Sequence, residues 1–447
     1  MRLGKDEYKG LHLRYTALMG DMTLADEENE DSSAPDTASI ESLFILLMSW
    51  LYQQRNFTPE MLTAEEVQRF INAHTDYLNK AVETALADVP LDEISVQRLK
   101  ESNYVFSGIK TFHELNEAFP SLIDSEGNLI PFNQFLNSVQ TINKSYNGQY
   151  LKVEYEFAKS SAYMAARWKE FEKDGEDYYL QYRTAGDARV RRTHQKLHGI
   201  TLPITSKFWD KYFPPNGWNC RCTVVQVRKD KYPLSDETQA MNLGSQATAG
   251  KHQEMFMYNP GKKMTTFPAY NAYTRKACIE CPYSGGSIKL AKVPDNELCR
   301  ACRILWEIRR QEQRNNYSKI VSGLKEKLIG KYSFTDEHFN GRSGVFVKNS
   351  ITENLGYGNL FYAKADILNN IEQYLSSATE YKWEDNRKKE KKPNLKGCHV
   401  FSTKYNGKEK AFSDFKIDLK FEDFNDGRII FHYIRFVDIE KGKKQNK

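Results

Sequence analysis

The chain has 447 residues, of which 40% are hydrophobic, 13% aromatic and 28% charged, a length that favours about two to four domains over one core. The longest apolar run, Leu43–Tyr52, is far shorter than the roughly 20 residues that span a bilayer, and the first ten residues lack the apolar segment of a secretory signal. We therefore expect neither a membrane protein, nor a secreted disulfide scaffold, nor a fully disordered chain.

Charge is distributed unevenly along the sequence. From Arg303 onward, 29 basic residues stand against 20 acidic ones, a net charge of +9, whereas the preceding residues carry 35 basic and 39 acidic groups, a net charge of −4. A basic tail suits an anionic partner such as DNA or RNA, although a solvated surface gives the same pattern.

The N-terminal part is expected to be helical. Residues 1–41 are acidic and lack an apolar period, which predicts a flexible segment. Residues 42–145 are expected to form a mainly helical domain. Its clearest helix is predicted after a capping Thr63, with one apolar face made of Val67, Phe70, Ile71, His74, Tyr77 and Leu78.

Two further helices are indicated before the middle of the chain. One is expected to begin at Asp92 or Ser95 and to run through Leu99, with short helical pieces and turns after it. The other is a long helix over Gly148–Lys173, which Gly175 ends by supplying a left-handed conformation. It opens an α+β module that we expect over residues 146–270.

The segment Tyr179–Cys222 is dense in charged and aromatic side chains. Buried Arg–Asp pairs are expected to lock one of its turns, and Pro214-Pro215-Asn216-Gly217 predicts a tight reversal. We find no nucleophile elbow, P-loop or dinucleotide fingerprint in the sequence, so a rigid structural module is favoured over an active site.

The same segment also allows a metal site. His194 and His198 have the i, i+4 spacing of one helix face, and Cys220-x-Cys222 supplies two sulfurs. The alternative hypothesis, which the sequence favours, is that His194 hydrogen-bonds locally while the cysteines pack.

Four other cysteines, in residues 271–304, have the spacing of a zinc knuckle. Cys278-x2-Cys281 is followed after 17 residues by Cys299-x2-Cys302. Each CxxC turn can point two thiolates at one centre, and two such turns complete a tetrahedron around zinc. We therefore predict one structural zinc ion at a four-cysteine site, with four unrelated cysteines as the alternative.

The remaining sequence is divided into a connector and a tail. Residues 305–331 are expected to form a polar helical connector, and residues 332–447 a basic α+β domain. In this tail, short β-rich runs flank one helix, and Asp426-Gly427 between two alternating runs predicts a hairpin.

A series of short motifs follows Tyr182: Arg183-Thr184, Asp187 with Val190-Arg191, His194 with Leu197 and Gly199, Phe208-Trp209, Pro214-Pro215 and Cys220-Arg221-Cys222. With the helix before them, these motifs resemble the phage Mu F-like minor head protein family, also called phage head morphogenesis proteins. The resemblance covers Tyr146–Gln226. It does not assign a chemical role to the motif residues, which are Arg183, Asp187, Arg191, His194, Cys220 and Cys222.

This resemblance implies a minor head protein of a tailed phage or prophage. Such a protein takes part in head morphogenesis near the portal, through protein–protein contacts rather than catalysis. The implied partners are portal, capsid or scaffold proteins, with no membrane. The implied location is the virion, and the host cytoplasm during assembly.

The tail, Tyr332–Lys443, is less closely similar to small phage-associated nucleases of the barnase–EndoU–colicin–RelE type. This similarity implies an alternative function, a delivered effector whose C-terminal domain is a metal-independent ribonuclease. Such cleavage needs a general acid, a general base and cations. The candidates are His399, His432, Lys416 and Arg435, whose placement in β-rich runs would let them converge on one sheet face.

Alternation along the last strand adds a finer prediction, that His432 shares a face with Ile434 and Arg435 shares the other with Tyr433. Two other hypotheses remain for this part of the chain. The tail is an accessory domain that binds a partner, or the protein is a DNA-binding packaging accessory that uses the zinc knuckle.

Overall fold

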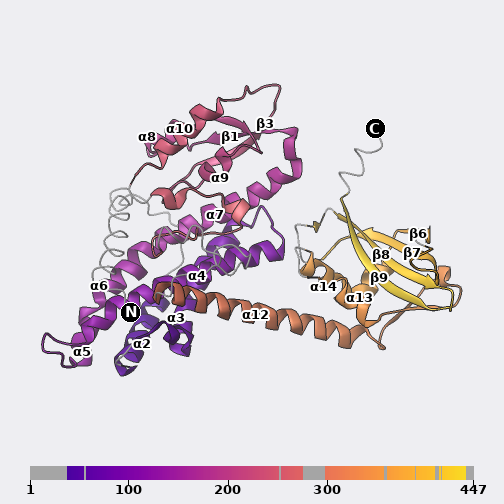
Figure 1. Cartoon of the computed structure of the whole chain (residues 1–447), viewed down its shortest axis with the longest axis horizontal. Helices are drawn as coiled ribbons and strands as arrows, with labels where there is room; N and C mark the ends of the chain where they lie inside the picture. Colours follow the sequence, from indigo (N-terminus) through magenta and orange to yellow (C-terminus); the bar gives the residue numbers. More distant parts are fainter. Residues whose placement is uncertain are drawn as a thin grey trace. The chain divides into compact units, whose positions relative to one another are not determined.

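The structure is a computed structural model that describes residues 38–54, 57–250, 253–274, 297–356, 360–387, 389–407, 412–413 and 415–438. The fold mixes helices and sheets and divides into two compact units, Met1–Val89 with Gln97–Arg309 and Pro90–Val96 with Arg310–Lys447 (Figure 1). The expected multidomain α+β class is confirmed at this level. Up to position 37, the predicted flexible segment lies outside the described residues. Within the described part of the chain, no helix has both the length and the apolarity needed to cross a membrane.

The N-terminal half of the described chain is mainly helical. Its elements are α2 (Ala38–Gln54), η1 (Pro59–Thr63), α3 (Glu65–Ala85), α4 (Glu93–Ala118), η2 (Phe119–Leu122), α5 (Phe132–Ser138), α6 (Gln140–Asn143), η3 (Lys144–Tyr150) and α7 (Leu151–Asp174). The α3 helix packs against both α2 and α7. Its predicted apolar face is confirmed, because all six of the residues named for it are buried.

Helix α4 is much longer than its sequence pattern suggests. It begins as expected, where the Asp92 carboxylate accepts hydrogen bonds from the Ser95 amide (3.0 Å) and hydroxyl (2.7 Å), but it runs to Ala118 instead of ending near Leu99. Residues 106–115 are all buried, so this stretch has no exposed face and therefore no amphipathic period to detect.

Polar side chains of α4 are consequently enclosed in the core. The Lys110 ammonium lies 2.7 Å from the carboxylate of Glu154 in α7, and their side chains are 1% and 0% exposed. One turn further along α4, Glu114 accepts a hydrogen bond from the amide of Asn147 (3.1 Å).

The module that follows is built on an antiparallel sheet with the order β2-β1-β3. Its elements are η4 (Gly175–Asp177), β1 (Tyr179–Arg183), α8 (Arg192–Gln195), β2 (Thr201–Pro203), α9 (Phe208–Tyr212), β3 (Thr223–Val227), α10 (Glu237–Ala247), η5 (Gln253–Phe256) and α11 (Pro260–Lys263). The predicted long helix is confirmed as α7, and Gly175 ends it with a positive φ of 57°. The C-terminal half of α7 supplies Met164, Trp168 and Phe171 to the core of this module.

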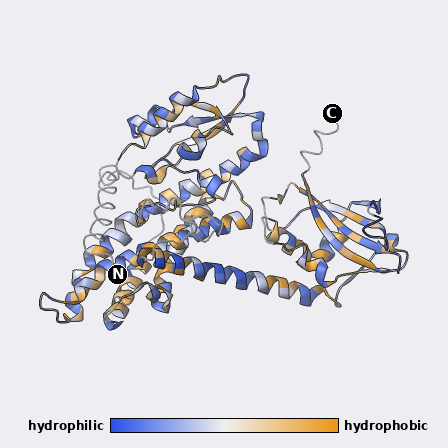
Figure 2. Cartoon of the chain, viewed as in Figure 1, coloured by the Kyte–Doolittle hydropathy of each residue, from blue (hydrophilic) through white to orange (hydrophobic). Residues whose placement is uncertain are grey.

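Helix α12 (Glu297–Leu328) covers most of the expected polar connector, residues 305–331, but begins eight residues earlier, and it is largely hydrophilic along its length (Figure 2). After it, the tail forms a six-stranded sheet with the order β4-β5-β9-β8-β7-β6. Its elements are β4 (Ser333–Thr335), η8 (Glu337–Phe339), β5 (Ser343–Val345), α13 (Lys348–Thr352), α14 (Phe361–Asn369), α15 (Ile371–Ser376), β6 (Glu380–Asp385), β7 (Leu395–Lys404), β8 (Phe415–Phe424) and β9 (Ile429–Asp438).

This sheet has two unlike faces. The core face carries Phe401, Leu419 and Phe421, which pack in one cluster with residues of α13, α14 and α15. The opposite face, called the charged face below, carries Glu384, Asp418, Lys420, Tyr433 and Arg435. The predicted hairpin at Asp426-Gly427 is confirmed between β8 and β9, where Gly427 has a φ of 89°.

Strand β9 is covered along the edge that β5 does not reach. Its pairing with β5 is parallel and involves Ile429 and Ile430. Beyond them, the Ser350 hydroxyl donates to the carbonyl of Phe431. The side-chain amide of Asn354 donates through its nitrogen to the carbonyl of His432 (2.8 Å). Its oxygen accepts a hydrogen bond from the backbone N–H of Ile434 (2.8 Å).

Candidate functional site

Three of the motif residues in the module come together inside it. His194 belongs to α8, and Cys220 and Cys222 lie just before β3. Their side chains are buried, and one ligand atom of each lies within 4.8 Å of the other two. The Nδ1 atom of His194 is 3.7 Å from the Cys220 sulfur and 3.8 Å from the Cys222 sulfur. This group of three can hold a metal ion.

The double-proline turn positions the two cysteines. Asn216, which is 1% exposed, accepts a hydrogen bond from the Tyr182 hydroxyl of β1 (2.9 Å), so the turn is fixed to the central strand. The turn closes when the Cys220 amide donates to the carbonyl of Gly217 (3.3 Å). The intervening Asn219 has a φ of 52°, in the left-handed region that asparagine tolerates better than most residues.

Arginine side chains lock the same segment from outside. The Arg221 guanidinium donates to both oxygens of Asp187 (2.6 and 2.7 Å), and this fork lowers the pKa of Asp187 to about 2. Arg191 donates to the carbonyl of Trp218 (2.7 Å), whereas Arg183 ends β1 opposite Thr223. The expected Arg–Asp lock is thus present, but it is half-exposed and not buried, with 41% and 38% of the two side chains accessible.

The second histidine of the predicted metal site does not join the group. The Nδ1 atom of His198 lies 2.9 Å from the Thr184 hydroxyl and 3.2 Å from its amide. The i, i+4 argument fails because α8 ends at Gln195, before His198. Both cysteines do approach His194. The pKa of the Cys220 thiol is lowered, mainly by hydrogen bonding to Cys222 and then to His194.

The predicted four-cysteine site is only half within the described residues. Cys299 and Cys302 lie in the first turns of α12, where their i, i+3 spacing puts them on one side of the helix. Cys278 and Cys281 lie outside the described residues. The zinc knuckle therefore stays a prediction.

In the tail, the four predicted catalytic candidates are distributed over both faces of the sheet. His399 lies on the core face, opposite Phe421 and in ring contact with Phe339 (4.7 Å between centroids). His432 instead lies 3.4 Å from Glu422, the next residue along β8, which points to the other face. The expectation that both histidines converge on one face is not met.

A register shift explains the position of His432. The pairing of β8 with β9 slips between Lys420 and Phe421, which is the signature of a β-bulge. Strict alternation would put His432 with Ile434, but Ile434 is buried in the core while His432 contacts Glu422. A bulge leaves no mark in the sequence, and for this reason alternation alone gives the wrong face.

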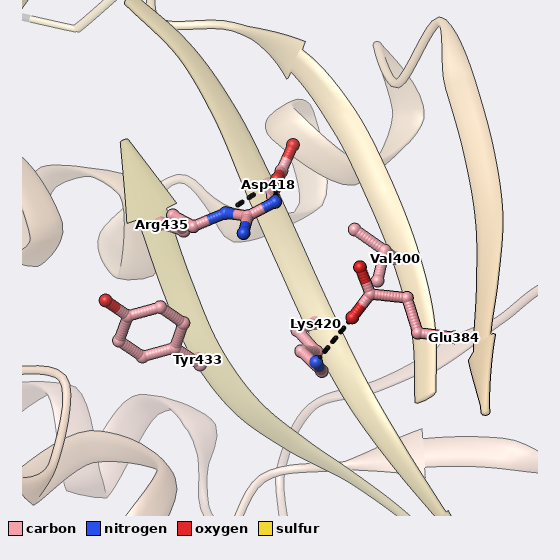
Figure 3. Close-up of a pocket in the computed structure, with 6 residues that line it drawn as sticks. All are labelled: Glu384, Val400, Asp418, Lys420, Tyr433 and Arg435. Carbon is pink, nitrogen blue, oxygen red and sulfur yellow. Dashed lines mark hydrogen bonds and ion pairs between the residues drawn. The ribbon is translucent and has the colours of Figure 1, made fainter. Parts of the chain in front are cut away.

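The cations of the charged face are already paired. A pocket of about 130 Å³ on this face is lined by Glu384, Val400, Asp418, Lys420, Tyr433 and Arg435 (Figure 3). Within it, Lys420 pairs with Glu384 (2.7 Å) and Arg435 pairs with Asp418 (2.5 Å). Lys416 pairs with Glu380 in the same way. A carboxylate partner on each of these three cations makes this face a poor phosphate site.

The core face carries a group that the sequence analysis missed. The Tyr381 hydroxyl lies 3.1 Å from Nδ1 of His399, whose Nε2 atom lies 3.4 Å from Asp423. The Tyr381 ring also stacks on His338, with 3.5 Å between the ring centroids. We call these four residues, together with Asp336, the tyrosine–histidine cluster.

Both histidines of this cluster have a carboxylate partner. Nδ1 of His338 lies 2.6 Å from Asp336, and the other carboxylate, Asp423, is held in a fork by Arg342 (2.8 and 2.7 Å). Burial lowers the pKa of His399, which favours a neutral ring near pH 7. The Asp-x-His pattern at 336–338 is a local signal, but its proximity to Tyr381 arises only from folding.

Comparison with known proteins shows that part of this chain is similar to one family. Residues 130–225 match the model of a family described as phage Mu protein F like protein. Capsid assembly protein F of Escherichia phage Mu is 38% identical over 71 residues, which cover 16% of this chain and 16% of that protein. The Mu-like prophage FluMu F protein of Haemophilus influenzae is 39% identical over 86 residues, or 17% of this chain and 21% of that protein.

A third relative is more distant. An uncharacterized protein of Methanocaldococcus jannaschii is 24% identical over 185 residues, covering 41% of this chain and 27% of that protein. The chain thus spans less than a third of the length of each of these relatives. No solved structure matches it significantly.

Proposed function

We propose that this chain is a minor head protein of a tailed phage or prophage, because residues 130–225 match the model of the phage Mu protein F like family. It acts in head morphogenesis, close to the portal, and its role is structural. The observation that carries the proposal is the match itself, which includes the locked turn of Asp187 and Arg221 and the buried His194. A relative that is 38% identical over 71 residues is named for capsid assembly.

The partners that we propose are portal, capsid or scaffold proteins. The protein reaches them in the host cytoplasm during assembly and remains in the virion. A module fixed by a short sheet, a double-proline turn and an external ion pair suits protein–protein contacts, because binding surfaces on rigid elements lose little conformational freedom on association.

Sedimentation of phage particles tests this function. After induction of a lysogen that expresses the full chain with a tag, we expect the protein to migrate with precursor heads and mature particles, in amounts far below those of the coat protein. A host cytoplasmic enzyme, followed in the same gradient, should stay at the top. Absence of the chain from both kinds of particle would refute the proposal.

We also propose that the cysteine pairs bind a structural zinc ion. The supporting observations are the spacing of Cys278, Cys281, Cys299 and Cys302 and the placement of the second pair on one side of α12. Four thiolates in a closed tetrahedron leave no open position, so the ion would stabilise the fold around it and take no part in a reaction.

A second candidate function is favoured by the tyrosine–histidine cluster. We propose that the basic C-terminal domain is an effector that cleaves RNA without a metal ion. His338, 35% exposed and oriented by Asp336, is the group best able to move a proton. The Tyr381 hydroxyl, 3.1 Å from Nδ1 of His399, holds the ring on which His338 stacks and so fixes the position of that imidazole.

The surroundings of the cluster suit a single-stranded nucleic acid. Trp383 is 38% exposed beside His399 and offers a ring on which a base can stack. The nearby loop between β6 and β7 contributes Lys389 and Lys391, which can contact the RNA backbone. On this proposal the core face, and not the charged face, binds the RNA.

Matched histidine variants test this second function in the full-length chain. With total RNA and EDTA, we expect cleavage that falls at least about 100-fold in His338→Ala and in Tyr381→Phe. The control is His432→Ala, which changes a histidine of the other face and should retain activity. An inert native chain, or equal losses in His338→Ala and His432→Ala, would refute the assignment to this cluster.

A further inference from the structure

Two buried thiol groups of the module lie close to one and the same nitrogen atom. Cys220 and Cys222 approach the same Nδ1 of His194, at 3.7 and 3.8 Å. A neutral imidazole has only one acceptor nitrogen, with one lone pair, so it cannot accept two good S–H hydrogen bonds at that atom. Only one of the two thiols can therefore donate to His194, and the convergence of both sulfurs on one buried nitrogen atom is the arrangement that a shared metal ion requires.

A bound ion accounts for both distances. Around tetrahedral zinc, with Zn–S of about 2.3 Å and Zn–N of about 2.0–2.1 Å, a nitrogen and a sulfur ligand lie about 3.6 Å apart. The two observed separations exceed this value by only 0.1 and 0.2 Å. We propose that His194, Cys220 and Cys222 bind a zinc ion through Nδ1 and the two sulfurs, a site distinct from the four-cysteine knuckle.

The chemistry of the donors favours zinc over other common ions. Two thiolates and an imidazole are soft or borderline ligands, which suit zinc and do not suit magnesium or calcium. Two thiolates also balance the 2+ charge of the ion, so the filled site is neutral. Neutrality matters because His194 is 2% exposed, and the two cysteines are 5% and 8% exposed.

The fourth position has no acidic, histidine or cysteine ligand among the described residues. His198 is diverted to Thr184, and Arg221 points outward to Asp187. The Tyr182 hydroxyl lies near both cysteines and donates a hydrogen bond to Asn216 (2.9 Å). We therefore assign this position to a water molecule or to Tyr182.

The ion would join two parts of the module that are distant in sequence. His194 lies in the short helix α8, and the cysteines lie 26 and 28 residues later, at the start of β3. A metal link closes this loop and reduces the freedom of the unfolded chain more than that of the folded one. This role does not depend on the proposed function in head assembly.

Metal analysis of full-length variants tests the site. In a chain that carries Cys278→Ser and Cys281→Ser, so that the predicted knuckle is disabled, we expect about one zinc ion per chain to remain. Adding Cys220→Ser should remove it, whereas adding Cys398→Ser, which changes a buried cysteine of the tail, should not. Less than a tenth of an equivalent in the first variant, or zinc that persists after Cys220→Ser, would overturn the proposal.

Cobalt substitution gives a second readout on the same double-serine chain, and it needs no further mutation. A thiolate-ligated cobalt ion has an intense charge-transfer band in the near ultraviolet, and strong visible bands report tetrahedral geometry. We expect both, and we expect a chelator to abolish them and to lower the melting temperature. A spectrum without charge-transfer bands would exclude thiolate ligation and contradict the assignment.

Discussion

We expect the Lys110→Met variant to lose about 3–5 kcal/mol of unfolding free energy, the usual cost of removing one partner from a buried ion pair. The Lys110 ammonium lies 2.7 Å from Glu154, and neither side chain is more than 1% exposed. Without Lys110, the Glu154 carboxylate keeps the hydroxyl of Tyr273 as a donor at 2.6 Å but loses the buried ammonium group that balances its charge. Urea unfolding followed by circular dichroism measures the loss.

The same helix provides a control. Lys100 of α4 also lies 2.7 Å from a carboxylate, that of Glu83, but these side chains are 29% and 61% exposed. Water screens such a pair, so Lys100→Met should cost no more than about 1 kcal/mol. The double variant Lys110→Met/Glu154→Leu should recover much of the loss, because it removes both buried charges. Equal losses in the two single lysine variants would show that burial does not control the cost.

We expect the Glu114→Gln variant to be more stable than the native chain above pH 8. Burial raises the pKa of Glu114 from 4.5 to about 8, even though the charge of Lys110 and the hydrogen bond from Asn147 oppose this shift. Glu154 and Glu117 also face it and raise the pKa further, while the neighbouring His74 has a lowered pKa because it is buried. The carboxyl group is therefore neutral in the folded protein at pH 7.

The sign of the pH dependence follows from linkage. The unfolded chain releases this proton near pH 4.5 and the folded chain only near pH 8, so the native protein loses stability as the pH rises through that interval. The shift corresponds to about 4–5 kcal/mol as an upper bound. Glutamine cannot ionise, and it can still accept the hydrogen bond from Asn147. The melting temperature of the Glu114→Gln variant should therefore vary much less between pH 5 and 9 than that of the native chain.

Glu117→Gln is the matched control for this measurement. Glu117 lies three residues further along α4 and is only partly buried, and it accepts a hydrogen bond from Tyr146 (3.1 Å). We expect this variant to keep most of the native pH dependence, because burial, and not the charge of Glu117, is the largest cause that raises the pKa of Glu114. If the melting temperature of Glu114→Gln fell with pH as steeply as that of the native chain, the destabilisation above pH 5 would come from other groups.

The sequence predicted those parts of the fold that local patterns determine. The helix after Thr63, the long helix that ends at Gly175 and the hairpin at Asp426-Gly427 are confirmed, because an amphipathic period, a positive φ and a turn dipeptide are local properties. The sequence also identified Asp187 and the Cys-Arg-Cys run as motifs, because both are short and distinctive. In the structure Arg221 of that run pairs with Asp187.

The sequence could not predict features that depend on distant contacts. Residues 106–115 of α4 are all buried, so this stretch has no alternation of apolar and polar faces. Nothing in the sequence therefore distinguishes the buried Lys110 and Glu114 from charged residues at the surface. In the tail, a bulge moves His432 to the charged face, and folding alone brings Tyr381 between His338 and His399. A single-sequence pattern contains neither the register of a ladder nor the pairing of remote side chains.

The side-chain cover on β9 has a consequence for association between copies of the chain. Ser350 and Asn354 occupy the carbonyls of Phe431 and His432 and the amide of Ile434, which are the backbone groups that a foreign strand would need. Between Phe431 and Ile434, these occupied groups are therefore not available for pairing with a strand of another copy. Where many such chains accumulate in a confined space, this stretch of β9 should not seed amyloid-like growth, and any ordered contact there must be made through side chains.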